Sequence, residues 1–200
     1  YWCPSCETAL AEAEVEYEDR QDPAIYVEFP LTKPLAGVVA PQGIWDGASV
    51  VVWTTTPWTL PANVALCFHP AHRYSLIETS KTDGGKKHLI VATELVESLQ
   101  SKLHLQSCRE LWGGPGSVFG TSLVAGQYAT LCKHPFGRPD SVGVTDEEVS
   151  LQEGTGIVHI APGHGEEDYL IGKRYGLEVF SPVDERGRFF GRVNVIDASV

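Results

Sequence analysis

The most informative stretch of this chain runs Trp53-Thr54-Thr55-Thr56-Pro57-Trp58-Thr59-Leu60-Pro61-Ala62-Asn63, residues 53 to 63. The apolar run that precedes it, from Ser49 to Trp53, predicts a buried strand. Proline fixes φ near about −65° and removes a backbone donor, so we expect Pro57 and Pro61 to end that strand and to hold the following loop in few conformations. A stiff loop with several hydroxyl groups predicts a polar, preorganised pocket wall for a small ligand.

Short apolar runs on both sides of this stretch predict a mainly β fold. They cover Ile25 to Phe29, Ser49 to Thr54, Asn63 to Cys67, Arg73 to Glu78, His88 to Ala92, Tyr128 to Cys132 and Gly156 to Ile160. Turns rich in proline and glycine separate them. Many short strands with a few helices predict an α+β fold in the form of a closed or nearly closed barrel.

Two helices are predicted among these strands. The first begins with Thr93 as its N-cap, and its apolar stripe is typical of core packing: Leu95, Val96, Leu99 and Leu103. The second runs from about Gly165 to Tyr175 and ends at Gly176.

The first turn of the second helix contains three acids, Glu166, Glu167 and Asp168. A carboxylate at a helix start is stabilised in its ionised form, which makes it a ready partner for an ammonium group. The alternative is a helix-start acid with a purely structural role. Helix geometry alone does not choose among the three acids.

Composition limits the classes of function. Two hundred residues suffice for one large domain or two small ones, and the absence of methionine leads us to expect a piece of a larger protein. The net charge of −11 has the wrong sign for a domain that binds nucleic acid by itself, so most of the affinity for an RNA substrate would come from elsewhere in the parent. No apolar run approaches the roughly 20 residues that span a bilayer, so we expect no membrane contact.

The cysteines and histidines give little support for a metal. Five cysteines without a secretory signal indicate a reducing compartment. Cys3 and Cys6 form a lone Cys-x-x-Cys pair, which is half of a four-thiolate zinc site. His159 and His164 have Pro162 between them, so they do not share a helix face as in a zinc motif. We therefore expect no metal at the site.

Two segments carry a family resemblance. The stretch from Trp53 to Asn63, with Gly154-Thr155-Gly156-Ile157-Val158-His159-Ile160-Ala161-Pro162-Gly163-His164-Gly165-Glu166-Glu167-Asp168-Tyr169, resembles the inserted editing domain (connective polypeptide 1) of bacterial-type isoleucyl-tRNA synthetase. The opening segment, Tyr1 to Tyr17, is similar to the one that leads into that domain. Related leucine and valine enzymes carry Thr-Thr-Arg-Pro where this chain has Thr54-Thr55-Thr56-Pro57, which favours the isoleucine member.

The resemblance implies a domain division and an activity. Residues 1–23 would connect to a catalytic core outside this chain, and residues 24–200 would form the editing domain. Within the connector, glutamate alternates with apolar residues from Ala11 to Tyr17, and this pattern predicts a solvent-facing ribbon strand. The implied reaction is hydrolysis of mischarged Val-tRNA(Ile) by water, with valyl-adenylate left open as a second substrate. The chain lacks His-Ile-Gly-His and Lys-Met-Ser-Lys-Ser, so no aminoacylation is expected from it.

Cofactors, partners and location follow from the same resemblance. Editing would need no cofactor. ATP, and zinc if the parent enzyme uses it, would bind to parts of that enzyme outside this chain. The partners would be the 3′ end of tRNA(Ile) carrying valine, valine or valyl-adenylate, and the catalytic core of the parent synthetase. We expect a monomer in the bacterial cytoplasm, or in the matrix of an organelle.

The candidate catalytic residues are Asp168, Thr54, Thr55, Thr56 and His159. By resemblance, Asp168 matches the aspartate that holds the free α-amino group of the substrate. His159 matches a histidine that borders the amino-acid side-chain pocket, although a lone buried histidine is usually a core group. The three threonines are suited to bind a carbonyl, a ribose hydroxyl or a water molecule.

The candidate substrate-binding residues are Trp53, Trp58, Thr59, Asn63 and His164. Asn63 resembles an asparagine at the edge of the family pocket. Each tryptophan suits stacking on the terminal adenine and equally suits a core position. Two other functions stay open: a non-catalytic module that binds an amino acid or the tRNA 3′ end, and a zinc-dependent hydrolase built on His159, His164, Cys3 and Cys6.

Overall fold

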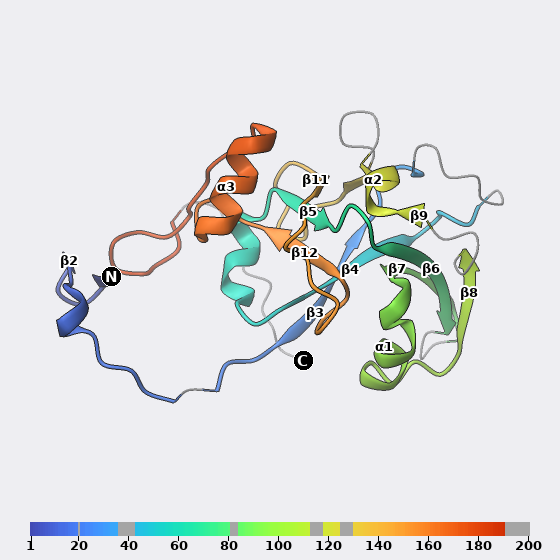
Figure 1. The fold of residues 1–200 in the computed structure, drawn as a ribbon, viewed down its shortest axis with the longest axis horizontal. Coiled ribbons are helices and arrows are strands. Elements are labelled where there is room, and N and C mark those ends of the chain that lie inside the picture. Colours follow the sequence, from blue (N-terminus) through green and yellow to red (C-terminus); the bar gives the residue numbers. More distant parts are fainter. Residues whose placement is uncertain (20, 36–42, 81–83, 113–117, 125–129, 191–200) are drawn as a thin grey trace.

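The computed structural model describes residues 1–19, 21–35, 43–80, 84–112, 118–124 and 130–190 (Figure 1). Most described strands form two sheets. The larger has the order β3 (Ile25–Pro30), β4 (Ala48–Thr54), β7 (Lys86–Ala92), β6 (Arg73–Ser80) and β8 (Cys108–Trp112), with β9 (Val118–Phe119) also paired to β6. The smaller has the order β10 (Leu131–Cys132), β11 (Ser141–Thr145), β5 (Ala65–Phe68) and β12 (Ile157–Ile160). A separate N-terminal ribbon pairs β1 (Trp2–Cys3) with β2 (Thr8–Ala9).

The helices are short. The α-helices are α1 (Val96–Lys102), α2 (Gly120–Leu123) and α3 (Glu166–Tyr175), and the 3-10 helices are η1 (Glu12–Glu14), η2 (Pro57–Ala62) and η3 (Thr93–Leu95). Within the described ranges, no helix has both the length and the apolar character that crossing a bilayer requires.

The two larger sheets pack face to face, with a helix on each outer side. Side chains alternate between the faces of a strand. In β4, Val50 and Val52 belong to the core between the sheets, whereas Val51 packs with Leu99 of α1 on the outer side. On the far side, Ile171 of α3 packs with the outward-facing residues of the smaller sheet. The order of layers is therefore α1, larger sheet, smaller sheet and α3.

The predicted mainly β fold with a few helices is confirmed, but the closed barrel is wrong. The described strands form open sheets, with β3 and β10 among their edge strands. The wall of a small barrel needs only one apolar face, whereas the central strands of this chain are apolar on both faces. Such strands are covered when two sheets pack together and helices shield the outer sides.

Most predicted elements are present at nearly the predicted bounds. Six of the predicted strands correspond to β3, β4, β5, β6, β7 and β12. Residues 128 and 129 of the seventh lie outside the described residues, and Leu131–Cys132 of that segment form β10. The second helix is confirmed as α3, and Gly176 ends it with φ of 65°. The sequence did not predict β8 or β11.

Two local predictions are wrong. The segment from Ala11 to Tyr17 is not a strand, because the Ala11 amide donates to Glu14 Oε2 at 2.8 Å and the chain forms η1. Thr93 does not cap the first helix. Its hydroxyl group pairs with Ser75 Oγ at 2.8 Å, and the helix is entered through η3.

The N-terminal ribbon lies beside the segment that follows α3 (Figure 1). Trp2 Nε1 donates to the Glu185 carbonyl at 2.7 Å, and Arg186 Nε donates to Glu7 Oε1 at 2.7 Å. These contacts join the two ends of the described chain. The assignment of residues 1–23 as a connector to a catalytic core stays a prediction.

Candidate functional site

A cavity of about 560 Å³ lies where the end of β4 meets β12 and the start of α3. It brings the threonine segment and the acidic helix start, which are about a hundred residues apart in the chain, around one space. The lining residues are Trp53, Thr54, Thr55, Thr56, Thr59, Val158, His159, His164, Gly165, Glu166, Glu167 and Asp168. All five candidate catalytic residues are among them.

The threonine segment is fixed by its own hydrogen bonds. The Thr56 amide donates to Thr54 Oγ1 at 3.1 Å, and the two hydroxyl groups lie 3.3 Å apart. Pro57 then begins η2, and Thr59 Oγ1 donates to the Thr56 carbonyl at 2.8 Å. Thr54 is buried, whereas Thr55 and Thr56 are exposed. The segment therefore presents hydroxyl groups from a short, hydrogen-bonded turn.

His159 lies in β12 with its ring on the inner face of the smaller sheet. Its Nε2 atom is 3.1 Å from Thr59 Oγ1. Burial, together with the nearby His164 and His134, lowers the pKa of His159 to about 4. The ring is therefore neutral at pH 7, and a group with so low a pKa is a weak base there.

Asp168 is the acid of the helix start whose carboxylate is anchored to the protein. Its Oδ2 atom accepts a hydrogen bond from the Ala161 amide at 2.7 Å. Burial raises the pKa of Asp168, and the Ala161 N–H opposes that rise. Glu166 and Glu167 are exposed. The carboxylate of Asp168 is thus partly desolvated and accepts one backbone donor, which leaves it suited to a cationic ligand.

The turn between β12 and α3 depends on close packing. A Cβ atom added to Gly163 would collide with the Phe180 carbonyl oxygen. A Cβ atom added to Gly172 would lie 2.7 Å from Cγ of Pro162. Gly163 thus lets the segment after α3 approach the turn, and Gly172 lets α3 approach it. The approach of α3 sets the position of Asp168.

The other predicted binding residues have different surroundings. Trp53 lines the cavity, and Gly154 packs against its ring, so that an added Cβ atom would lie 3.2 Å from Cε3. Trp58 is 51 % exposed, and its ring meets that of His164 edge-on at 5.2 Å between centroids. Trp58 therefore lies next to the cavity, behind one of its lining residues.

Asn63 does not line the cavity. It is buried, its Nδ2 atom donates to the Ala65 carbonyl at 2.8 Å, and its Oδ1 atom accepts from Ser141 Oγ at 2.5 Å. In this structure its amide group joins the start of β5 to β11.

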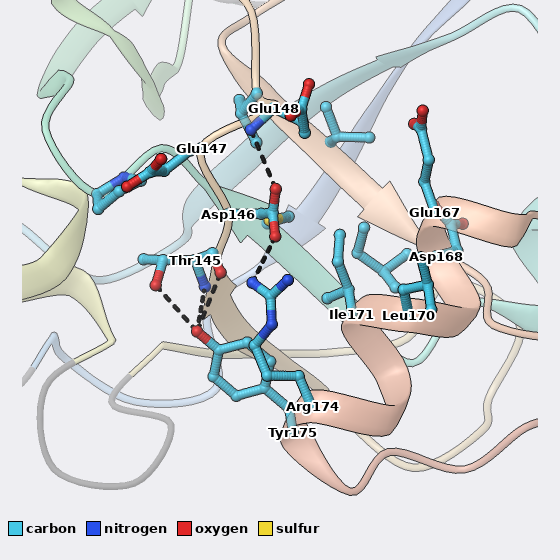
Figure 2. Close-up of a pocket in the computed structure, with 15 residues that line it drawn as sticks. Thr145, Asp146, Glu147, Glu148, Glu167, Asp168, Leu170, Ile171, Arg174 and Tyr175 are labelled. Carbon is cyan, nitrogen blue, oxygen red and sulfur yellow. Dashed lines mark hydrogen bonds and ion pairs between the residues drawn. The ribbon is translucent and has the colours of Figure 1, made fainter.

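A second cavity, of about 690 Å³, adjoins the first on the outer side of β12 (Figure 2). The two share Val158, Glu167 and Asp168. On its far wall, Arg174 Nη1 donates to Asp146 Oδ2 at 2.6 Å, and the Tyr175 hydroxyl group donates to the Thr145 carbonyl at 3.0 Å. These bonds tie the last turn of α3 to the end of β11, as Figure 2 shows.

The part of the chain that the structure describes contains no group of three or more histidine, cysteine or acidic side chains placed to hold a metal ion. The residues of the zinc hypothesis, His159, His164, Cys3 and Cys6, do not form such a group.

Sequence reasoning missed three parts of the site. It did not predict that the Ala161 amide would hold Asp168, that Thr59 would contact His159, or that Val158 would form part of the wall between the two cavities. The proline and glycine of the turn after β12 are a signal that the backbone there is constrained. The contact between Thr59 and His159 has no local signal, because it depends on how the sheets pack.

The chain is similar to curated isoleucine–tRNA ligases over nearly its whole length. It is 46 % identical to the isoleucine–tRNA ligase of Moorella thermoacetica over 189 residues, and this match covers 94 % of this chain and 18 % of the relative. With that of Geobacter sulfurreducens it shares 43 % identity over 205 residues, covering 100 % of this chain and 21 % of the relative. The chain thus spans about a fifth of the length of these relatives. A scan against protein-family models gives no match.

Solved structures with a similar fold are editing domains of leucyl-tRNA synthetases. The crystal structure of GlLeuRS-CP1 matches with a TM-score of 0.55 and 16 % identity, covering 78 % of this chain and 66 % of that one. The cytosolic leucyl-tRNA synthetase editing domain of P. knowlesi matches with a TM-score of 0.51 and 11 % identity, covering 70 % of this chain and 58 % of that one.

Proposed function

This chain is homologous to a segment of the isoleucine–tRNA ligases and has the fold of a synthetase editing domain, and we propose on that basis that it removes wrongly attached amino acids from tRNA by hydrolysis. The observation that carries the proposal is the shared cavity, which is lined both by Thr54, Thr55 and Thr56 and by Asp168 with its anchored carboxylate. One end of an aminoacylated nucleoside is a cation and the other is rich in hydroxyl groups, so the two walls suit its two ends.

The substrate that we propose is the valyl ester of tRNA(Ile), with valyl-adenylate as a second candidate. By the established double-sieve argument for this family, one methylene group distinguishes valine from isoleucine by only about 1–3 kcal/mol in an apolar pocket. A synthetic site for isoleucine therefore admits valine, and a second site must destroy the valyl product.

The proposed reaction is direct attack of water on the ester carbonyl. Asp168 binds the α-ammonium group, and the hydroxyl groups of Thr55 and Thr56 orient the carbonyl or the water. The bond between the acyl carbon and the ribose oxygen breaks. A proton from the water ends on that oxygen, and the products are valine and tRNA with a free 3′-terminal hydroxyl group. The neighbouring hydroxyl group of the terminal adenosine, which the family resemblance implicates, assists the attack.

His159 is proposed to act by shape. Because its pKa is lowered to about 4, its neutral ring makes a poor general base at pH 7. The buried ring instead forms a wall of the space for the amino-acid side chain.

The binding energy for tRNA is proposed to come mainly from the parent protein. The chain has a net charge of −11, which repels phosphate groups. We therefore propose that the domain works as one part of a monomeric synthetase, joined to its catalytic core.

The test is single-turnover hydrolysis of Val-tRNA(Ile) and Ile-tRNA(Ile) by the parent synthetase that contains this chain. We expect faster hydrolysis of the valyl ester and a fall of about 30-fold or more in Asp168→Asn, because losing one partner of a desolvated charge pair costs about 2–5 kcal/mol. The control is Glu97→Gln, which removes another helix-start acid, in α1. Equal rates for the two esters, or an Asp168→Asn variant as fast as the control, would contradict the proposal.

The alternative is a module that binds the aminoacylated end without chemistry. It is favoured by the Thr54 and Thr56 hydroxyl groups, which are within hydrogen-bonding distance of each other and have no base as a described partner. Binding experiments do not separate the two functions, since both predict affinity. Release of valine from the ester under single-turnover conditions separates them.

A further inference from the structure

We infer that Thr59 is a positioning residue that fixes the ring of His159, and that this contact sets how well the site discriminates between amino-acid side chains. The second half of this inference rests on the proposed editing function. The first half concerns only the two side chains. Both are 6 % exposed, and they lie on elements a hundred residues apart in the chain.

The hydrogen bonds of Thr59 determine which nitrogen of His159 carries the proton. A threonine hydroxyl group has one hydrogen, and that of Thr59 goes to the Thr56 carbonyl at 2.8 Å. Its oxygen must therefore accept in the 3.1 Å contact with His159 Nε2. In a neutral imidazole, a protonated Nε2 leaves Nδ1 without a hydrogen.

This arrangement withdraws both ring nitrogens of His159 from a ligand. Nε2 is engaged by Thr59. Nδ1 is buried from solvent and has no hydrogen-bond partner among the described residues. The ring therefore meets the cavity as a wall of fixed shape, with no donor or acceptor offered to a ligand.

Thr59 is well placed to hold that wall still. Its own amide also donates to the Thr56 carbonyl, at 3.0 Å, so that the residue is fixed by backbone and side chain in η2. His159 is fixed at its backbone by the pairing of β12 with β5, where it lies opposite Leu66. This pairing does not fix the rotation of the His159 ring, and the hydrogen bond to Thr59 is a contact that restrains it.

Loss of the Thr59 hydroxyl group should therefore let the ring turn and exchange its tautomers. A turned ring changes the width of the space beside it. While the ring is fixed, the space beside it excludes the extra methylene group of isoleucine. Once the ring can turn, the same space would admit that group.

The experiment compares Thr59→Val, which keeps the shape and removes the hydroxyl group, with Thr59→Ser, which keeps the hydroxyl group. The matched control is Thr79→Val, because the Thr79 hydroxyl group is buried on β6 and has no hydrogen-bond partner within the described ranges. Nitrogen-15 NMR of histidine-labelled protein distinguishes protonated from bare ring nitrogens, and His159→Gln identifies the signals of His159. In the parent synthetase, single-turnover rates give the ratio of valyl to isoleucyl ester hydrolysis.

We expect His159 to carry its proton on Nε2 in the wild type, in Thr59→Ser and in Thr79→Val, and to show mixed tautomers in Thr59→Val. The valyl-to-isoleucyl ratio should fall about three- to tenfold in Thr59→Val alone, in the range that one neutral hydrogen bond supports. A proton on Nδ1 in the wild type would overturn the inference without any variant. An unchanged tautomer and ratio in Thr59→Val would also overturn it. If no variant hydrolyses either ester, the proposed function fails, while the NMR result still decides whether Thr59 positions the ring.

Discussion

At the scale of single residues, Asp168 carries two opposing effects. Its carboxylate is partly buried, which disfavours the charge and raises its pKa, and it accepts a hydrogen bond from the Ala161 amide, which favours the charge. Burial is the larger effect. A carboxylate that is kept at some expense in stability is typical of a binding site, where function and stability are in conflict.

Asp168→Asn should therefore stabilise the fold while it removes activity. The amide oxygen of asparagine still accepts from Ala161, and no charge has to be desolvated. We expect the free energy of unfolding at pH 7 to rise by about 0.5–2 kcal/mol, the usual gain when a functional compromise is removed. Urea denaturation of the chain measures it.

Glu97→Gln is the matched control for this prediction. Glu97 is an exposed acid in the first turn of α1, so its loss shows what a helix-start charge contributes, and we expect a decrease of a few tenths of a kcal/mol. If Asp168→Asn lowers stability as much as Glu97→Gln does, Asp168 is an ordinary helix-start acid and its proposed role is wrong.

At this scale, the sequence predicted which residues meet but not how they are held. The threonine segment and Asp168 were identified from motifs, and both line one cavity. Asn63 was predicted at the pocket edge, yet its amide group joins β5 to β11, because a buried amide must satisfy its donors and acceptors within the protein. The bond between Thr59 and His159 joins two elements whose approach depends on sheet packing, which no local pattern encodes.

At the scale of elements, the approach of α3 to the turn after β12 positions the site. Gly172 lies in α3 against Pro162, and a Cβ atom there would come within 2.7 Å of the proline ring. Helix propensity alone favours alanine over glycine by about 1 kcal/mol. Packing acts in the opposite direction, because overpacking costs about 1–3 kcal/mol.

We expect packing to dominate in Gly172→Ala, with a net loss of stability of up to about 2 kcal/mol from these opposing values. Because α3 must move away from Pro162, we also expect slower hydrolysis of the valyl ester by the parent enzyme. Thermal denaturation and single-turnover kinetics measure the two effects. Lys173→Ala, at the exposed neighbouring position, should change neither. A stabilised Gly172→Ala variant would show that α3 does not rest on this contact.

Elements with strong local signals were predictable, and those without were not. α3 has acids at its start, bases at its end and Gly176 in the left-handed conformation, and it was predicted to within one residue. β11 was missed because Gly143 interrupts its pattern, and that glycine is needed since a Cβ atom would lie 2.7 Å from Cβ of Thr130. The closed barrel was wrongly predicted because strand number and spacing alone do not separate a closed barrel from two packed sheets.

At the scale of the whole molecule, buried histidines make stability depend on pH. The pKa values of His159 and His134 are each lowered to about 4, mainly by burial. In the unfolded chain they would be near about 6.5. The unfolded state therefore binds more protons between these values, so stability is lost as the pH falls from about 6.5 towards 4.

We expect each of these histidines to remove about 3 kcal/mol of stability by pH 4, since one unit of pKa shift corresponds to about 1.4 kcal/mol. Asp168 acts in the opposite sense, because a raised pKa means that protonation favours the folded state. His159→Gln isolates one contribution. Its free energy of unfolding should fall less steeply between pH 7 and pH 4, because about one proton fewer is taken up on unfolding. A slope identical to that of the wild type would show that His159 is charged, or open to solvent, in the folded protein.

The most direct measurement is a crystal structure of the parent synthetase with a non-hydrolysable valyl-adenosine analogue. The ammonium group of the analogue should lie within hydrogen-bonding distance of the Asp168 carboxylate, with its ribose and carbonyl oxygens beside Thr55 and Thr56 and its isopropyl group against the His159 ring. An analogue bound in this cavity with its amine turned away from Asp168, or bound outside the cavity altogether, would contradict the account.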